Sequence, residues 1–155
     1  MDIILRPIAF VHSPVAGPKE DYWGEVVSEI ELAAHLSPDA LQGLNDFSHI
    51  EVLFHFHRLS EDAIISGCRH PRGNANWPEV GIFAQRAKAR PNRLAATICQ
   101  VVAVKGRTIT VKGLDALNGS PVVDIKPVLA EFLPDKSAMR QPKWSHEMMA
   151  NYFAQ

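Results

Sequence analysis

Short strand-like runs, separated by glycine, proline and asparagine, are the feature that most constrains the fold of this chain. Apolar and β-branched residues alternate over a few positions and then stop, which is the pattern of half-buried β-strands. The runs are residues 8–11, 26–32, 49–57, 81–84, 97–104 and 108–112. Many short strands without regularly alternating helices favour a closed antiparallel sheet over a doubly wound one. The sequence therefore predicts a mainly β fold: a single small antiparallel β-barrel with one or two short helices, non-Rossmann and unknotted.

Three local signals mark the breaks between these elements. Lys105-Gly106-Arg107 predicts a three-residue hairpin turn that joins the last two runs, with glycine in the left-handed conformation. Ser37 before Pro38 predicts the start of a short helix that ends near Gly43. The Asn-Gly pair at residues 118–119 predicts a further turn.

We expect residues 1–134 to form the barrel domain and residues 135–155 to form a C-terminal tail or helix. This tail spaces apolar side chains as a helical stripe that can pack on a partner subunit, namely Met148, Met149, Tyr152 and Phe153.

The sequence also excludes several classes of protein. No stretch approaches the ~20 apolar residues of a membrane span, and no basic segment with a long apolar run opens the chain, so we expect a cytoplasmic protein with no membrane partner. A Gly-x-Gly-x-x-Gly turn and a phosphate-binding loop are both absent. Cys68 and Cys99 fit neither a disulfide framework nor a Cys-x-x-Cys metal site, so we expect reduced thiols, with Cys99 in a core strand.

The net charge of −1 conceals a segregation of charge along the chain. Residues 1–68 hold 3 Lys/Arg and 11 Asp/Glu, residues 69–107 hold 8 and 1, and residues 108–155 hold 5 and 5. The middle segment, at +7, can attract the phosphates of a polyanion. Alternatively, its cations pair with the acidic first third, inside the fold or across a dimer.

His55-Phe56-His57-Arg58 is the first of three segments that could carry chemistry. In a continuous strand, period two puts His55 and His57 on one face, away from the phenylalanines. With Glu61, this His-x-His pair imitates part of a cupin metal site, but the glycines and the second histidine box of such a site are missing. The alternative is a pair of histidines on a solvated strand face, and we assign no metal site.

The other two segments place polar groups in loops, where the binding residues of rigid scaffolds usually lie. Residues 85–93 carry four cations and contain Pro91, which predicts a basic loop that leaves a strand. Residues 113–121 place Asp115 just before a turn, where its carboxylate can accept a hydrogen bond from a ligand ammonium or ribose. A solvated basic loop and a purely structural turn are the alternatives.

Over about residues 3–134, these segments together resemble the YaeB-like family of tRNA methyltransferases. The resemblance rests on several strings that are unusual in combination: Phe47-Ser48-His49, the Phe-x-Phe-His of residues 54–57, His70-Pro71-Arg72-Gly73-Asn74, Gly81-Ile82-Phe83-Ala84, Arg90-Pro91-Asn92, Leu114-Asp115 and Pro121-Val122-Val123-Asp124-Ile125-Lys126-Pro127.

The resemblance implies a homodimer of β-barrels that binds S-adenosylmethionine near the dimer interface. Its implied substrate is tRNA, with no DNA partner, and its implied reaction is methylation of the exocyclic nitrogen of threonylcarbamoyladenosine beside the anticodon. Carried over position by position, the cofactor contacts fall on His57, Arg58, Arg86, Leu94, Asp115, Ala116, Leu117 and Asn118. We expect the loops that carry them to meet at one mouth of the barrel.

Further roles follow for the basic segment and for two possible bases. The candidate RNA contacts are Arg72, Lys88, Arg90, Asn92 and Arg93. His57 and Asp124 are candidate general bases, and the sequence does not choose between them.

The chain departs from the best-known branch of this family at positions that affect the identity of the substrate more than the use of the cofactor. That branch reads Arg-Pro-Asn-Pro-Ile-Gly, whereas Arg93 and Ala95 replace the second proline and the glycine here. Residues 18–24 stand where the branch has a Pro-Arg-Gln stretch, and we expect a short branch without the C-terminal extension of longer members. Two other classes stay open: a metal-dependent, cupin-like barrel enzyme and a non-catalytic S-adenosylmethionine-binding module.

Overall fold

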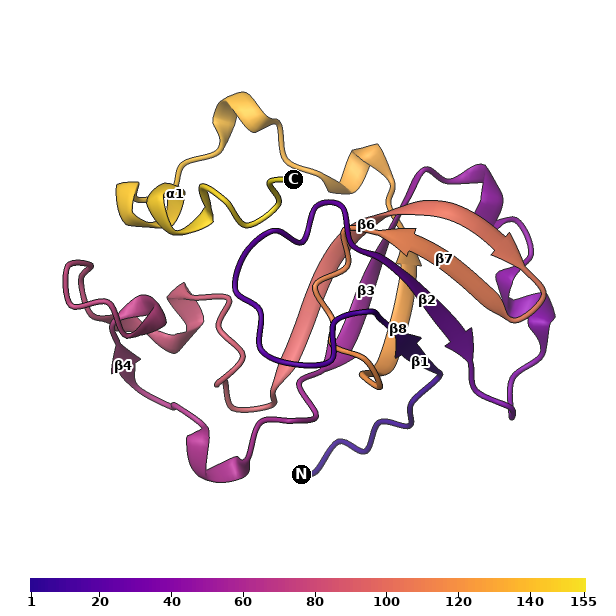
Figure 1. Cartoon of the computed structure of the whole chain (residues 1–155), viewed down its shortest axis with the longest axis horizontal. Coiled ribbons are helices and arrows are strands. Elements are labelled where there is room, and N and C mark those ends of the chain that lie inside the picture. The colour runs from indigo at the N-terminus through magenta and orange to yellow at the C-terminus, as the bar shows by residue number, and fades with distance from the viewer.

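Six antiparallel strands close into a barrel in the computed structural model, which describes residues 1–155 (Figure 1). The strands are β1 (Ala9–His12), β2 (Val27–Leu32), β3 (His49–His55), β6 (Leu94–Lys105), β7 (Thr108–Lys112) and β8 (Pro121–Pro127). Their order around the barrel is β1-β2-β7-β6-β3-β8, and β8 pairs with β1 to close it. Every pair is antiparallel, so the predicted mainly β, non-Rossmann barrel is confirmed.

The alternation of side chains along the strands explains why the sheet closes. Buried and exposed residues alternate without a break along β2, and the same period holds in β1, β3 and β7. Inward side chains of all six strands therefore meet in one core. It includes Ile30, Ile50, Val52, Phe54, Cys99, Ile109, Val111 and Val122. Cys99 is buried in β6 and both cysteines are free thiols, as predicted.

Regular helix is scarce. The one α-helix is α1 (Lys143–Met149), and the other helical segments are single 3₁₀ turns. These turns span Pro38–Leu41, Leu44–Asp46, Glu61–Ala63, Pro71–Gly73, Ile82–Ala84, Ala130–Phe132 and Lys136–Ala138. No helix has the length and apolar content that would let it cross a membrane.

Two predicted strands end sooner than expected. The strand predicted at residues 81–84 stops at Gly81, because Ile82 turns inward into a 3₁₀ turn and its N–H bonds Gly67 O at 2.9 Å. Only a two-stranded sheet remains there, β4 (Cys68–Arg69) with β5 (Val80–Gly81). The strand predicted to reach His57 ends at His55, because the His57 N–H folds back onto the His55 carbonyl at 2.8 Å.

The predicted turns form, with small differences in length. The β6–β7 turn has two residues rather than three, because β6 extends to Lys105, and Gly106 is left-handed as predicted (φ +57°). Ser37 caps a 3₁₀ turn and accepts a hydrogen bond from Asp39 N at 3.2 Å. The Asn-Gly turn at residues 118–119 joins β7 to β8, which are not neighbours, so it belongs to a crossover rather than a hairpin.

The long connections gather at one end of the barrel. Because neighbouring strands run antiparallel, the ends of β1, β3 and β7 lie beside the starts of β2, β6 and β8. Residues 13–26, 56–93 and 113–120 all leave from this end, which we call the loop end. In Figure 1 the connection that carries β4 extends to the left of the barrel, and α1 lies above this connection.

Candidate functional site

The loop end brings together the elements that carry the predicted cofactor contacts. His57 and Arg58 follow the end of β3, Leu94 begins β6, and Asp115 to Asn118 lie in the β7–β8 connection. His55 at the end of β3 pairs with Leu94 at the start of β6, which fixes the relative positions of those two elements.

Asp115 is held in place by two hydroxyl groups. Its neighbours Leu114 and Ala116 are fully buried and anchor the connection in the core, which leaves Asp115 at the edge of it. Thr97 Oγ1 on β6 donates to Asp115 Oδ1 at 2.6 Å, and the Tyr152 hydroxyl of the C-terminal segment donates to Oδ2. A carboxylate has about four acceptor positions, so this arrangement orients the group and leaves acceptor capacity free.

The charge of Asp115 affects two neighbouring groups. Burial raises the pKa of Tyr152 well above its ordinary value and Asp115 adds to this effect, while the positive charges of Arg72 and Arg86 oppose it. Burial, followed by the charge of Asp115, raises the pKa of Cys99 to about 12. At neutral pH Tyr152 is therefore a donor, and the Cys99 thiol is protonated and poorly nucleophilic.

Two arginines border this part of the loop end. Arg86 donates to the carbonyl oxygen of Ala96, next to Thr97, and Arg58 donates to the carbonyl oxygen of Ala16. Both side chains are exposed, and a guanidinium has five N–H donors, so each keeps donors available for a bound anion.

His57 lies against the second half of the β7–β8 connection. A Cβ atom on Gly119 would sit 3.6 Å from His57 Nε2, and the Asn118 side chain accepts from Ser13 N at 3.1 Å. Burial and the charge of Arg58 lower the pKa of His57, with the hydrogen bond to His55 opposing, which keeps the imidazole neutral at neutral pH. The predicted cofactor residues with contacts thus fall into two groups, one around Asp115 and one around His57, and the β7–β8 connection runs from one group to the other.

The candidate RNA contacts differ in whether they already form ion pairs within the protein. Arg72 pairs with Asp21 at 2.9 Å and with Glu20 at 4.0 Å, and Arg93 pairs with Glu61 at 3.6 Å. These are the only two of the eight cations in residues 69–107 that form ion pairs with carboxylates. Pairing with the acidic first third therefore accounts for part of the basic segment and leaves most of its charge uncompensated.

The remaining candidates lie in the loop before β6. Arg90 donates to Gln85 O at 2.8 Å and its guanidinium carbon lies 6.0 Å from the centre of the Phe83 ring. Lys88 and Asn92 are exposed, and Lys88 forms no ion pair. Arg93 has a left-handed backbone (φ +50°) and also donates to Leu59 O at 2.7 Å.

Asp124, the second candidate base, occupies a different position. It lies on β8 next to the inward-packed Ile125, and its carboxylate pairs with Lys126 at 2.5 Å. No group of three or more His, Cys, Asp or Glu side chains in the structure could hold a metal ion, so His55 and His57 have no third ligand.

Sequence reasoning missed Thr97 and Tyr152 as members of the site. Thr97 had a detectable signal, because it places a polar side chain at a buried position of a core strand. Tyr152 had none, since its partner Asp115 is 37 positions away and lies in a loop.

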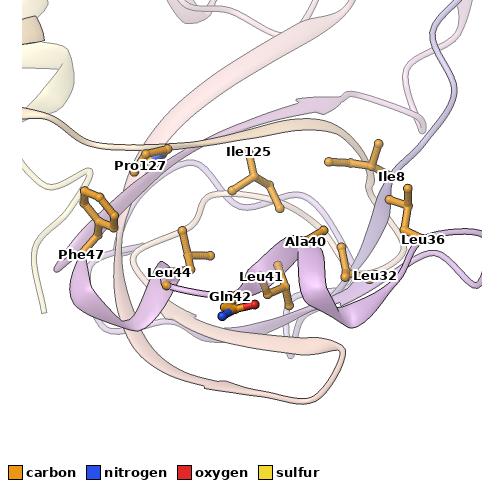
Figure 2. Close-up of a pocket in the computed structure, with 11 residues that line it drawn as sticks. Ile8, Leu32, Leu36, Ala40, Leu41, Gln42, Leu44, Phe47, Ile125 and Pro127 are labelled. Carbon is orange, nitrogen blue, oxygen red and sulfur yellow. The ribbon is translucent and has the colours of Figure 1, made fainter.

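A separate apolar pocket lies at the opposite end of the barrel (Figure 2). It has a volume of about 420 Å³ and is lined by Ile8, Leu32, Leu36, Ala40, Leu41, Gln42, Gly43, Leu44, Phe47, Ile125 and Pro127. None of the predicted site residues is among them, so this pocket is not the predicted site.

A family model connects the fold to known proteins. Residues 13–133 match the model described as the tRNA-methyltransferase O N-terminal domain. This range contains every predicted cofactor and RNA contact.

Individual relatives point in the same direction. A probable S-adenosyl-L-methionine-binding protein of Methanothermobacter thermautotrophicus is 39% identical over 82% of this chain and 90% of its own. The tRNA (adenine(37)-N6)-methyltransferase of Escherichia coli is 43% identical over 69% of this chain and 48% of its own. A crystal structure of TrmO superposes with a TM-score of 0.73 and 26% identity, over 90% of this chain and 64% of that chain. The chain thus spans less than two thirds of the solved protein and of the bacterial enzyme.

Proposed function

The chain belongs to the tRNA-methyltransferase O N-terminal domain family, and from this premise we propose that it is an S-adenosylmethionine-dependent methyltransferase that acts on tRNA. The observation that carries the proposal is the family match over residues 13–133, together with the gathering of the predicted contacts at the loop end. The names of the archaeal and bacterial relatives support the cofactor and the substrate class, respectively.

The residues of the loop end suit the polar groups of this cofactor. Asp115 retains free acceptor positions that match an amino group or a ribose hydroxyl, while Arg58 and Arg86 retain donors that match a carboxylate. Ala116 and Leu114 are buried beneath Asp115 and would keep this part of the connection rigid when a ligand binds.

When bound, S-adenosylmethionine supplies an electrophilic methyl group on a sulfonium centre. The main task of the protein in such a displacement is to hold the nucleophile about 3 Å away and in line, with water excluded. Loops that are anchored by hydrogen bonds on a rigid barrel perform this positioning. The neutral imidazole of His57 can accept the proton that the nucleophile loses, whereas Asp124 is already paired with Lys126.

The basic loop supports RNA as the substrate. Lys88 and Arg90 lie in the loop before β6 and pair with no carboxylate, whereas Arg93 pairs with Glu61. Arg86 links the same loop to the Asp115 group. Cations that no carboxylate neutralises attract the phosphate backbone. We propose that the methylated base is the adenosine beside the anticodon, at the exocyclic nitrogen of its threonylcarbamoyl form.

The replacement of a proline by Arg93 in the loop before β6 supports a substrate-binding surface that is specific to this chain. The φ angle of +50° at Arg93 is incompatible with the proline of the best-known branch, because the proline ring fixes φ near −65°. The backbone at residue 93 therefore differs from the one that a proline requires, and a cation stands where that branch has an apolar ring.

We further propose a homodimer in the cytoplasm. Support for the dimer comes from the segment after β8, which exposes four large apolar side chains within eleven residues. These are Leu129, Phe132, Leu133 and Met139.

The direct test is a methyl-transfer assay with radiolabelled S-adenosylmethionine and total tRNA from cells that lack the native methylation. We expect label on the modified adenosine beside the anticodon, located by nuclease digestion and mass spectrometry. Binding of the cofactor without any transfer would favour the second candidate, a non-catalytic S-adenosylmethionine-binding module, which the description of the archaeal relative also allows. No binding and no transfer would contradict both.

A further inference from the structure

The C-terminal segment docks onto the loop end through its backbone. Tyr22 N donates to Asn151 O at 3.0 Å, and Trp23 N donates to Tyr152 O at 2.8 Å. Gly24 completes the contact, since the carbonyl of Phe153 occupies the space that a Cβ atom at this position would need. The β1–β2 connection and the C-terminal segment are therefore fitted to each other at consecutive residues.

Side chains on both sides extend this contact. Trp77 Nε1 donates to Glu147 Oε2 at 3.0 Å, which ties α1 to the connection between β4 and β5. Gln155 donates to Glu25 at 3.3 Å at the end of the chain. The C-terminal segment thus contacts two of the three long connections of the loop end, and Tyr152 reaches Asp115 in the third.

The Tyr152 contact controls the orientation of one carboxylate oxygen. Thr97 binds Oδ1 and Tyr152 binds Oδ2, so neither oxygen can rotate without breaking a hydrogen bond. Hydroxyl donors to an ionised group form short, strong hydrogen bonds. Burial keeps the pKa of Tyr152 high, so the phenol stays a donor over the physiological range.

We propose that Tyr152 is a positioning residue for the cofactor site, which holds the Asp115 carboxylate so that its free acceptor positions face the ligand. This inference rests on the proposed function, because it takes Asp115 to be a cofactor contact. The matched backbone fit at Gly24 favours a built-in wall of the site over a lid that must leave before the ligand enters.

The test compares cofactor affinity, measured by calorimetry, in the full chain and its variants. We expect Tyr152→Phe to raise the Kd for S-adenosylmethionine about 5- to 10-fold, since a hydrogen bond to a charged group is lost. Tyr22→Phe is the matched control, because Tyr22 is the only other tyrosine, is 51% exposed, and its hydroxyl makes no hydrogen bond within the chain. We expect its Kd to equal that of the native chain.

A double-mutant cycle separates positioning from a general effect on folding. If Tyr152 acts through Asp115, Tyr152→Phe has no further effect on affinity in an Asp115→Ala background, which removes the acceptor that Tyr152 binds. A merely structural role would weaken binding by the same factor in both backgrounds and would overturn the inference. Tighter binding by Tyr152→Phe would also overturn it, because that result identifies the segment as a competitor of the ligand.

A substitution that displaces the backbone of the C-terminal segment tests the role of Tyr152 in a second way. Gly24→Ala displaces the Phe153 carbonyl and is expected to weaken cofactor binding as Tyr152→Phe does, whereas Gly17→Ala, with open space around its Cβ position, leaves the Kd unchanged. A native chain that fails to bind the cofactor contradicts the proposed function itself. Native binding that is unaffected by both Tyr152→Phe and Gly24→Ala contradicts only the role of Tyr152.

Discussion

Thr97 Oγ1 donates a hydrogen bond to Asp115 Oδ1 at 2.6 Å, which ties the inner face of β6 to the connection between β7 and β8. Thr97 is buried, so its hydroxyl has little access to water and Asp115 is its partner in the fold. A local strand residue thereby determines where a distant loop carboxylate points.

Thr97→Val tests this contact at nearly constant shape. Removing the donor leaves a partly buried carboxylate with one hydroxyl fewer, so we expect a loss of about 1–2 kcal/mol in the free energy of unfolding. Thr97→Ser, which keeps the hydroxyl, is expected to lose less. Urea unfolding followed by circular dichroism measures both, and equal stability of the valine variant and the native chain would show that the contact contributes nothing.

Lys88→Ala is expected to weaken tRNA binding and to lower the salt dependence of log Kd by about one unit, because one exposed cation without an ion pair is removed. Filter binding over a range of salt concentrations measures this effect. Lys136→Ala removes an exposed lysine from the C-terminal segment and is the control. The same loss for both variants would mean that tRNA responds to net charge rather than to the basic loop.

The stability of the chain should depend on pH through two histidines. Burial and the charge of Arg93 lower the pKa of His55, and burial and the charge of Arg58 lower that of His57. Below the unfolded pKa of about 6.5, the unfolded chain binds protons more readily than the folded one, so stability falls as the pH falls. Above that pH, the two states hold the same number of protons on these groups.

The double variant His55→Gln/His57→Gln is therefore expected to lose less stability than the native chain between about pH 7 and about pH 5.5. Urea midpoints at the two pH values give the comparison. Carboxylates titrate in both proteins and cancel in the difference. An identical loss in both proteins would rule out the two histidines as the source of the pH dependence.

Two serines that are each 2% exposed provide a matched pair for the energetics of the barrel. Ser28 Oγ has no hydrogen-bond partner, whereas Ser120 Oγ donates to Leu117 O at 2.7 Å, in the turn that ends the β7–β8 connection. We expect Ser28→Ala to leave the Tm unchanged or to raise it, and Ser120→Ala to cost about 1 kcal/mol. Calorimetric melting curves measure both effects. A larger loss of stability from Ser28→Ala than from Ser120→Ala would contradict these hydrogen-bond assignments.

The barrel was predictable because its signal is local. Alternation along β2 and β7 depends only on the residues of each strand, and closure follows once several such strands must bury one face. The strand ends were harder to predict, since the end at His55 depends on a backbone turn and the end at Gly81 on the burial of Ile82.

The residues of the candidate site were easier to predict than the contacts between them. The resemblance to the family selected Asp115 and Arg86, and the antiparallel topology explains why their loops share one end of the barrel. The contact of Tyr152 could not be predicted, because it depends on how the C-terminal segment packs against residues 22–24. No periodicity in the sequence encodes that packing.

Backbone amide chemical shifts during titration with S-adenosylmethionine test the central claim, a cofactor site at the loop end, most directly. We expect the largest changes to cluster at His57, Arg58, Arg86 and residues 94 and 115–118, and the apolar pocket around Leu41 and Phe47 to stay unaffected. Changes confined to that apolar pocket, or no saturable change anywhere, would contradict the claim.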